Sequence, residues 1–472
     1  MTQSAILFWM RRDLRLSDHE GLSQAAQTGR PVIPVFIHDE AVDGLGAAPK
    51  WRMGLAVSHF QEVLQGIGSD LVLRRGPALD VLKELIAETG AGAVWWSRGY
   101  DPASIARDTA VKSSLKAQGV AAHSFAGHVL FEPWSVQTKT GGYYKVFTPM
   151  WKAVRGRDLA PCVPAVRALP APSHWPASED ISTWGMGAGM QRGMRILSKH
   201  VVVGEAAAQA RLAEFIDLAL PEYALARDQM GIRGTSMLSE NLTYGEISPR
   251  MCFHAGRMSL SMGQSGAEVF LKELVWRDFA YHLAFHTPHI ISENWRAEWD
   301  AFPWNTDETT PEVVAWTQGR TGVHLVDAAM RELYVTGYMH NRGRMIVASY
   351  LTKHLMTHWK IGQAWFAQCL LDWDPASNAM GWQWSAGCGP DASPYFRVFN
   401  PDTQAEKFDP DRRYRARYLA QAYADCGEEA RDYFRAIPAS WGLSFEDAYP
   451  PQPIVGLAQG RQRALEAYKT RG

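Results

Sequence analysis

The feature that most constrains this chain is the stretch Met339–Trp384, in which polar groups interrupt helices of otherwise apolar pattern. Residues 339–359 carry apolar side chains at helical spacing, which predicts a helix with one buried face. Asn341 lies three and four residues before Arg344 and Met345, so these side chains share one face of that helix. Because buried polar groups need partners, we expect something polar opposite Asn341 and Arg344.

The second part of this stretch concentrates acids, amides and tryptophans. A second helix is predicted over Ile361–Leu371, and the polar residues and tryptophans follow it. Any one of them alone is more often a packing residue or a helix cap. Their density in helices that are otherwise apolar indicates a functional site. The residues are Asp372, Asp374, Asn378, Trp382 and Trp384.

Composition bounds the class of protein. The 472 residues exceed one typical domain, so we expect two. The net charge of −1 gives no global sign of nucleic acid binding, although the total hides local patches. Five scattered cysteines without a Cys-x-x-Cys motif predict no disulfides and a cytoplasmic protein. Neither a signal peptide nor an apolar run of membrane-spanning length is expected.

The N-terminal part alternates predicted strands with predicted helices. This alternation favours a doubly wound parallel sheet covered on both faces, in an α/β domain over residues 1–127. The predicted strands are Ala5–Met10, Pro31–Ile37, Leu71–Arg74 and Ala93–Trp96, and the predicted helices are Trp51–Gly66, Leu79–Thr89 and Pro102–Gln118. Arg11, Arg12 and Asp13 follow the first strand, where such sheets bind ligands. No Gly-x-Gly-x-x-Gly motif follows it, so a nicotinamide dinucleotide site is not supported.

Residues 128–202 are rich in Pro, Gly and small residues, which predicts a long surface connection. Residues 203–472 show helical patterns and are expected to form an all-α domain. Within it, Thr235, Ser236 and Ser239 bring hydroxyls to the start of a helix, where they either cradle a phosphate or simply cap the helix. On the predicted helix Glu268–His286, the side chains of residues 273, 276 and 277 share a face.

Three ordered motifs, MHNRGRM, LLDWDPASNAMGWQW and GPDASPYFRVFNP, resemble the flavin core of the DNA photolyase and cryptochrome family. The resemblance is strongest to the bacterial class I-type cyclobutane pyrimidine dimer photolyases. It extends from FWMRRDLRLSD at the start to AEKFDPD near the end. It implies an antenna-binding domain at 1–127, an interdomain connection at 128–202, and an FAD- and DNA-binding catalytic domain at 203–472.

The resemblance also implies roles for individual residues. Catalytic contacts to substrate and flavin would come from Glu273, Trp276, Asn341, Met345, Asn378 and Trp384. Electron transfer would follow Trp304, Trp359 and Trp382. Flavin would be bound by Tyr223, Thr235, Ser236, Met237, Leu238, Ser239, Arg277, Arg344, Asp372, Trp373, Asp374 and Asn378. DNA would be bound by Arg227, Trp276, Asn341, Arg342, Trp384 and Gln404.

The implied cofactor is FAD, with an antenna chromophore that the motifs do not identify. Methenyltetrahydrofolate is the first expectation, a deazaflavin or a flavin are alternatives, and an empty antenna site stays open. One branch of the family carries an iron–sulfur cluster, but the tryptophan motifs resemble the cluster-free branch, so no metal is expected. The expected partner is DNA containing pyrimidine dimers, bound by a monomer that acts in the cytoplasm at the nucleoid.

The implied function is light-driven repair of cyclobutane pyrimidine dimers, by electron transfer from photoexcited reduced FAD to a flipped-out dimer. The alternative is a blue-light sensor of cryptochrome type without repair activity. A flavin oxidoreductase with a nicotinamide donor is a further rival, which the missing dinucleotide motif disfavours. Tyr338, Ala379 and Met380 depart from the pattern of many relatives, and Met380 is expected close to the flavin.

Overall fold

A computed structural model describes residues 4–392 and 396–470. It divides into two compact units, each built from several segments of the chain. Unit 1 comprises residues 1–188, 202–220 and 236–288, and unit 2 comprises residues 189–201, 221–235 and 289–472. By compactness, therefore, residues 202–220 and 236–288 group with the N-terminal domain. The functional division predicted at 127 and 202 stays a prediction.

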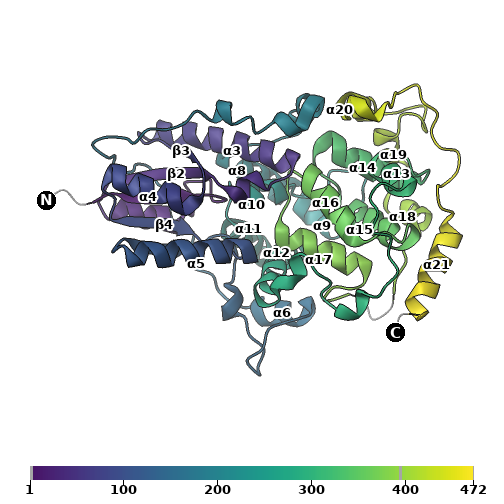
Figure 1. The fold of residues 1–472 in the computed structure, drawn as a ribbon. Helices are drawn as coiled ribbons and strands as arrows, with labels where there is room; N and C mark the ends of the chain where they lie inside the picture. The colour runs from purple at the N-terminus through teal and green to yellow at the C-terminus, as the bar shows by residue number, and fades with distance from the viewer. Residues whose placement is uncertain (1–3, 393–395, 471–472) are drawn as a thin grey trace. The chain divides into compact units, whose positions relative to one another are not determined.

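Unit 1 is built on a five-stranded parallel sheet in the order β3-β2-β1-β4-β5 (Figure 1). The strands are β1 Ile6–Met10, β2 Val32–His38, β3 Val72–Arg75, β4 Ala93–Ser97 and β5 Ala121–Phe125. β1 and β2 are buried along their whole length, as expected for central strands covered on both faces. Sequence patterning missed β5, an edge strand with alternate exposed residues and no apolar run.

Helices cover the sheet and extend unit 1 (Figure 1). They are α1 Glu20–Gln27, α2 Glu40–Asp43, α3 Ala47–Gly66, α4 Ala78–Thr89, α5 Pro102–Ala117, α6 Phe147–Val154, α8 Glu205–Glu214, α10 Ser239–Tyr244, α11 Pro249–Ser261 and α12 Ala267–His286. The long helix predicted over residues 268–286 is confirmed as α12. α6 lies inside the predicted connection and packs on α12.

The described part of unit 2 is helical, apart from one isolated bridge between Asn305 and Thr357. Its helices are α7 Met194–Leu197, α9 Tyr223–Ala226, α13 Pro311–Thr317, α14 His324–Thr336, α15 Asn341–Ser349, α16 Trp359–Cys369, α17 Pro375–Ala386, α18 Pro401–Phe408, α19 Arg413–Tyr418, α20 Glu428–Ala436 and α21 Leu457–Thr470. α14 is the central helix, buried on most of its surface. This architecture confirms the predicted fold class, an α/β N-terminal domain with a helical C-terminal part.

The single helix predicted over residues 339–359 is wrong in its extent. α15 ends at Ser349, a wider π-helical segment spans Tyr350–His354, and Trp359 begins the next helix, α16. The apolar spacing continues through the wider turn, so periodicity alone did not reveal the break. Within the described ranges, no helix is both long and apolar enough to cross a membrane.

Candidate functional site

The predicted lesion-facing tryptophan of unit 1, Trp276, is already stacked on one face. Its ring lies on Phe147 of α6, with centroids 3.8 Å apart and planes 7° from parallel. Phe279 meets both rings edge-on, at 5.6 Å and 6.0 Å. Glu273 lies one turn before Trp276 on α12 and is half-buried. Trp276 is therefore held in place by aromatic neighbours.

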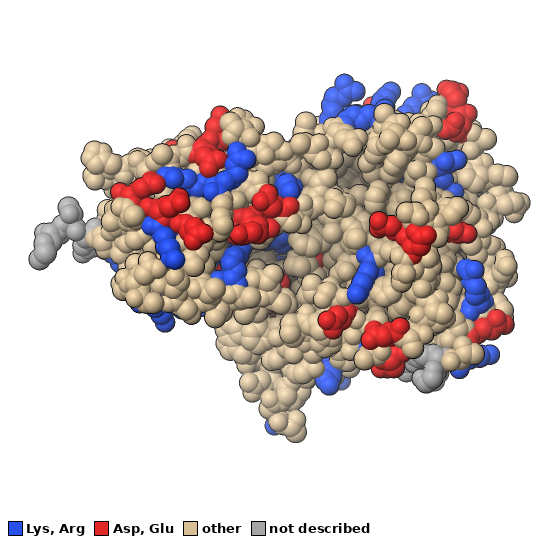
Figure 2. All heavy atoms as spheres, viewed as in Figure 1, with Lys and Arg blue, Asp and Glu red and all other residues tan. Residues whose placement is uncertain are grey.

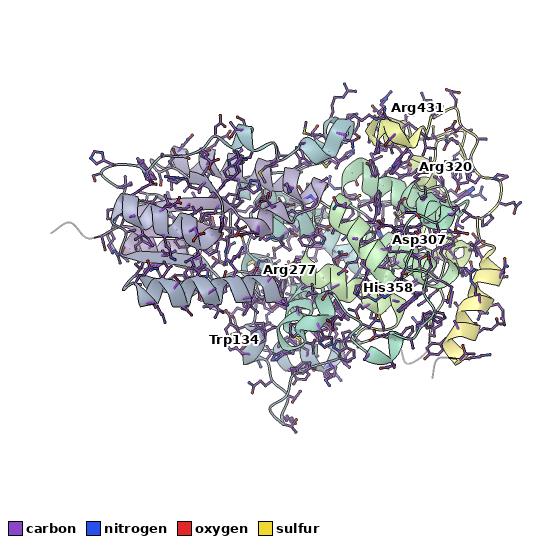
Figure 3. All side chains as sticks on the ribbon, viewed as in Figure 1. Trp134, Arg277, Asp307, Arg320, His358 and Arg431 are labelled. Carbon is purple, nitrogen blue, oxygen red and sulfur yellow. The ribbon has the colours of Figure 1, made fainter. Side chains whose placement is uncertain are left out.

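Arg277 follows Trp276 on α12 and is held by His128 (Figure 3). Its Nη1 donates to the His128 carbonyl, and its Nη2 lies 3.0 Å from His128 Nε2. Burial, reinforced by Arg277, lowers the pKa of His128 well below its ordinary value. The imidazole is therefore neutral beside the guanidinium.

Asp278, which sequence analysis did not single out, fastens α12 to the segment that follows β5. Its Oδ2 accepts the backbone N–H groups of Leu130 and Phe131, at 2.8 Å and 2.9 Å. Burial raises the pKa of this carboxyl to about 7. An acid one turn after Leu274 and Val275, on the apolar face of α12, was the available signal.

The predicted diphosphate-binding segment lies across a strained turn at the start of α10. Met237 has a left-handed backbone, with φ of 53°, and its carbonyl accepts Arg211 Nη1 at 2.7 Å. Leu238 occupies the N-cap position without a side-chain hydrogen bond to the helix, and Ser239 begins α10. Ser236 Oγ lies 3.4 Å from the Leu238 amide. Helix-start amides without a side-chain cap are the donors that a phosphate accepts.

In unit 2, Arg344 finds the polar partner predicted for it. Its Nη2 lies 2.7 Å from Asp372 Oδ2, and its Nε donates to the Met339 carbonyl at 2.8 Å. Burial by itself would lower the pKa of Arg344, but Asp372, together with Tyr338 and Glu332, raises it. The guanidinium also lies over the Tyr338 ring, at 5.3 Å.

Tyr338, one of the departures from the family pattern, is part of the same cluster in unit 2. Burial raises the pKa of its phenol to about 12, and Thr235 lies within hydrogen-bonding reach of it. The structure therefore brings Thr235, Arg344 and Asp372 together around this ring. Tyr223 is buried at the start of α9.

Helix α17 begins at Asp374, whose Oδ1 accepts the Ser377 amide at 2.7 Å and caps the helix. One turn later, Asn378 Nδ2 donates to the Gln363 carbonyl of α16 at 3.1 Å. Trp373, just before the cap, is half-buried. Asn378 thus has its amide oriented by a neighbouring helix.

The two tryptophans of α17 flank Gln383, which anchors this end of the helix. Gln383 Nε2 donates to the carbonyls of Ile290 and Glu293, and its Oε1 accepts the Trp295 amide at 2.8 Å. Trp384 Nε1 donates to the Asp391 carbonyl at 3.1 Å. Sequence analysis did not single out Gln383, which is fully buried and therefore needs these partners.

Trp304, Trp359 and Trp382, the predicted electron-transfer residues, are all buried in one apolar core cluster of unit 2. The ring of His358, which is labelled in Figure 3, lies 4.8 Å from the Trp304 ring and 5.5 Å from the Trp359 ring, so aromatic contact is continuous between the two tryptophans. Trp382 packs against the next turn of α16: a Cβ added at Gly362 would lie 2.0 Å from its ring. The three side chains therefore share one core, while electron transfer along them stays a prediction.

The predicted DNA-binding arginines share one carboxylate. Arg342 forms a fork on Asp228, with contacts of 2.9 Å and 2.5 Å, and Arg227 Nε lies 3.9 Å from the same carboxylate. Asn341 is exposed at the first turn of α15, and Met345 Sδ lies 3.8 Å from Arg342 Nη1. Gln404 is half-buried on α18. On the face drawn in Figure 2, basic and acidic side chains are interspersed.

At the carboxyl end of the sheet in unit 1, the charged groups bind one another. Arg11 forms a fork on Asp108, with contacts of 2.6 Å and 3.0 Å, and Trp96 Nε1 donates to the same carboxylate at 3.0 Å. Asp13 pairs with His19 at 3.1 Å. The polar residues nearest the end of β1 therefore have protein partners. Among the described residues, no cluster of His, Cys, Asp or Glu side chains could hold a metal ion.

Comparison with known proteins places the chain in a family. Residues 6–173 match the model described as DNA photolyase, and residues 270–470 match the FAD binding domain of DNA photolyase. The deoxyribodipyrimidine photo-lyase of Agrobacterium fabrum is 43% identical over 473 residues, covering 98% of this chain and 97% of that protein.

Solved structures agree with this placement. A bacterial class III photolyase from Agrobacterium tumefaciens has a TM-score of 0.91 at 41% identity, covering 100% of this chain and 98% of its own. A Synechocystis cryptochrome has a TM-score of 0.84 at 26% identity, covering 99% of each chain. The sequence motifs had suggested a class I-type relative, whereas this solved photolyase is of class III. The chain belongs to the DNA photolyase family, as a DNA-repair enzyme of the deoxyribodipyrimidine photo-lyase type with an FAD-binding domain.

Proposed function

We propose that this enzyme repairs cyclobutane pyrimidine dimers in DNA, using light and fully reduced FAD. The observation that carries the proposal is the stack of Phe147 on Trp276 beside Glu273. A rigid indole with one covered face is a wall against which a flipped-out base can stack. The names of the relatives, deoxyribodipyrimidine photo-lyases, support the same substrate.

The energetics of base flipping favour such a wall. Extruding bases from a duplex costs about a few kcal/mol, and less for a lesion that already disrupts pairing. Stacking on an aromatic side chain is worth roughly 1–3 kcal/mol per base. Trp276 and Trp384, each fixed by its neighbours, would offset the cost of flipping. Glu273 and Asn341 would hydrogen-bond the base edges, and Met345 would add apolar contact.

The polar residues of unit 2 fit a flavin. Arg344, fixed on Asp372, and Asn378, oriented by Gln363, offer a cation and an amide for a ring that carries both donors and acceptors. When bound, reduced flavin supplies on excitation the electron that splits the dimer and receives it back, so the reaction has no net redox change. Arg344 would stabilise negative charge, and Asn378 would hold the ring edge without supplying a proton.

The remaining residues are proposed to bind the flavin diphosphate, the flavin and DNA, or to transfer electrons. Ser236, Met237, Leu238 and Ser239 at the start of α10, together with Tyr223 and Thr235, would hold the diphosphate. Arg277, Trp373 and Asp374 would complete the flavin contacts. Arg227, Arg342 and Gln404 would contact DNA, and Trp304, Trp359 and Trp382 would carry electrons to the flavin. An antenna chromophore, first methenyltetrahydrofolate and otherwise a deazaflavin or flavin, and a monomer acting on cytoplasmic DNA belong to the same proposal.

A photorepair assay tests the function. Reduced, flavin-loaded protein is mixed with dimer-containing oligothymidine and illuminated with blue light, while recovery of thymine absorbance is followed. We expect recovery that requires light and is lost in Trp276→Ala. Trp175→Ala, at an exposed tryptophan outside the proposed site, is the matched control and should repair normally. No recovery from protein with bound, reducible flavin would contradict repair and favour the cryptochrome-type sensor.

A further inference from the structure

Beside Trp384, unit 2 contains a pocket that the proposed dimer contacts do not explain. The pocket is partly open, and the empty space in and in front of it, solvent included, amounts to about 510 Å³. Of the proposed dimer-contacting residues, only Trp384 lines it. Its other lining residues include three basic side chains, Arg296, Lys353 and Arg397, and no acidic side chain.

Lys353 is a buried amine without a counter-ion among the described residues. Its side chain is on the π-helical segment after α15 and is only 4% exposed. Its Nζ donates to the Arg397 carbonyl, and no carboxylate of the described chain lies within ion-pair distance. Burying an unpaired charge costs several kcal/mol, so buried lysines are normally paired or lose their proton. The pocket therefore presents an amine that a bound anion would hold in its charged form.

The walls of the same pocket are aromatic. Phe396 stacks on Tyr468 of α21, with centroids 4.6 Å apart and planes 7° from parallel. Lys353 Nζ lies 4.9 Å from the Phe396 ring. The Trp384 ring is held by its hydrogen bond to the Asp391 carbonyl. Flat walls next to basic groups are the composition that binds nucleotides, because the bases stack and the phosphates need positive charge.

We propose that this pocket binds one undamaged nucleotide, with its phosphate at Lys353, Arg296 and Arg397 and its base against the aromatic wall. The nucleotide would come from the DNA strand next to the lesion, which rests on the proposed function, or from free nucleotide. The pocket shares Trp384 with the proposed dimer contacts, whereas Asn341, Met345 and Asn378 do not line it.

The charge state of Lys353 gives the binding a pH signature. Burial, followed by Arg397, lowers the pKa of Lys353 to about 7. The charged and titratable side chains around it are those of Arg296, Arg397, His354 and Cys388. Burial lowers the pKa of His354 to about 4 and raises the pKa of the Cys388 thiol. A bound phosphate favours charged lysine. Affinity for oligothymidine, whose phosphodiesters do not titrate in this range, should therefore fall as pH rises from 6 to 8.

Nucleotide titration of the flavin-loaded full chain tests the proposal in the dark. Thymidine monophosphate, dimer-free oligothymidine and inorganic phosphate are each titrated while tryptophan fluorescence is followed. We expect nucleotide to bind and Lys353→Met to weaken binding about tenfold or more, because a charge-assisted hydrogen bond is lost. The pH dependence should disappear with it. Lys360→Met, at an exposed lysine of α16, should bind like the wild type. Arg397→Gln, at an exposed side chain, gives a second variant in case Lys353→Met does not fold.

The results of these titrations distinguish a DNA strand from a free nucleotide as the ligand of the pocket. Lysine-dependent binding of oligothymidine alone supports a DNA strand, and equal binding of thymidine monophosphate supports free nucleotide. Binding that neither variant weakens, or phosphate binding as tight as nucleotide binding, would overturn the nucleotide site. Light-driven dimer repair is measured separately on the same preparations. Failure of the nucleotide proposal can therefore be told apart from failure of the repair proposal, because either activity can be lost while the other is retained.

Discussion

At the scale of single residues, the stacking of Phe147 on Trp276 restricts the motion of the tryptophan ring. Both rings are fixed, so the indole reaches the substrate preorganised and loses little side-chain entropy when a base stacks on it. Phe147 itself touches no proposed substrate atom. It is a positioning residue that acts through Trp276.

Phe147→Leu should weaken binding of dimer-containing DNA roughly two- to tenfold, since an aromatic pair contributes about 0.5–1.5 kcal/mol beyond its buried area. Repair per absorbed photon at saturating substrate should change little, because the groups proposed at the flavin are untouched. Phe147→Tyr should restore affinity. Phe253→Leu removes a buried phenylalanine with an edge-on partner and is the stability control. Equal losses of affinity in the two leucine variants would show a general packing effect.

Asp278 should make unit 1 less stable as the pH rises. Its pKa is raised from 3.8 to about 7 by burial, so the folded chain holds this proton more tightly than the unfolded chain. Its contribution to stability is present below about pH 4 and is lost between about pH 4 and 7. Asp278→Asn should therefore unfold at a higher denaturant concentration than wild type at pH 8, by up to about 4 kcal/mol. It should show no such gain at pH 4.

Urea unfolding of both chains at the two pH values measures this difference. Asp80→Asn, at an exposed position on α4, supplies the control for the loss of one carboxylate. A constant offset between Asp278→Asn and wild type across the pH range would contradict the linkage.

At the scale of elements, the site depends on how α17 begins. Asp374 accepts the Ser377 amide, and the helix so started carries Asn378, Trp382 and Trp384. Removing an N-cap side chain typically costs about 1 kcal/mol. The cap and the proposed flavin contact are therefore combined in one carboxylate.

Asp374→Ala should lower thermal stability and retain less flavin. Asp374→Ser keeps a capping oxygen, so it should recover the stability of the flavin-free chain. It should not recover flavin retention if the carboxylate itself contacts the cofactor. Melting curves of the flavin-free variants, together with flavin content after gel filtration, separate the two effects. Full flavin retention in Asp374→Ser would leave Asp374 with the capping role alone.

Helices and strands were predictable from sequence where the apolar residues followed one regular spacing or formed one continuous run. The first four strands and α12 follow directly from apolar runs and helical spacing. β5 and the break after Ser349 did not, because a polar edge strand and a widened turn leave the apolar pattern nearly unchanged. Long-range partners were also hidden. Phe147 stacks on Trp276, and His128 contacts Arg277. In both pairs the residues are far apart in the sequence, so no local sequence pattern predicts the contact.

At the scale of the whole molecule, the chain passes between the two compact units five times, at 188/189, 201/202, 220/221, 235/236 and 288/289. Unit 2 needs the early segments 189–201 and 221–235. α7 from the first packs on α14, and Met230 from the second donates its amide to the Phe408 carbonyl at 2.9 Å.

The fragment 289–472 should therefore fail to form a stable fold, although it contains most of the proposed flavin residues of unit 2. The fragment lacks α7, whose buried side chains are Ile196 and Leu197, so the surface of α14 on which α7 packs would be exposed to water. Circular dichroism and limited proteolysis of the fragment beside the full chain measure this. A protease-resistant, cooperatively melting fragment would show that the early segments are dispensable.

Gly362 has no chemistry of its own, yet its missing side chain makes room for the Trp382 ring. Any larger residue would have to push the indole aside or wedge α16 and α17 apart. In a saturation-mutagenesis screen for photoreactivation, this position should tolerate as little variation as a cofactor ligand. Such a screen would identify Gly362 as essential, although no role in binding flavin or DNA is proposed for it.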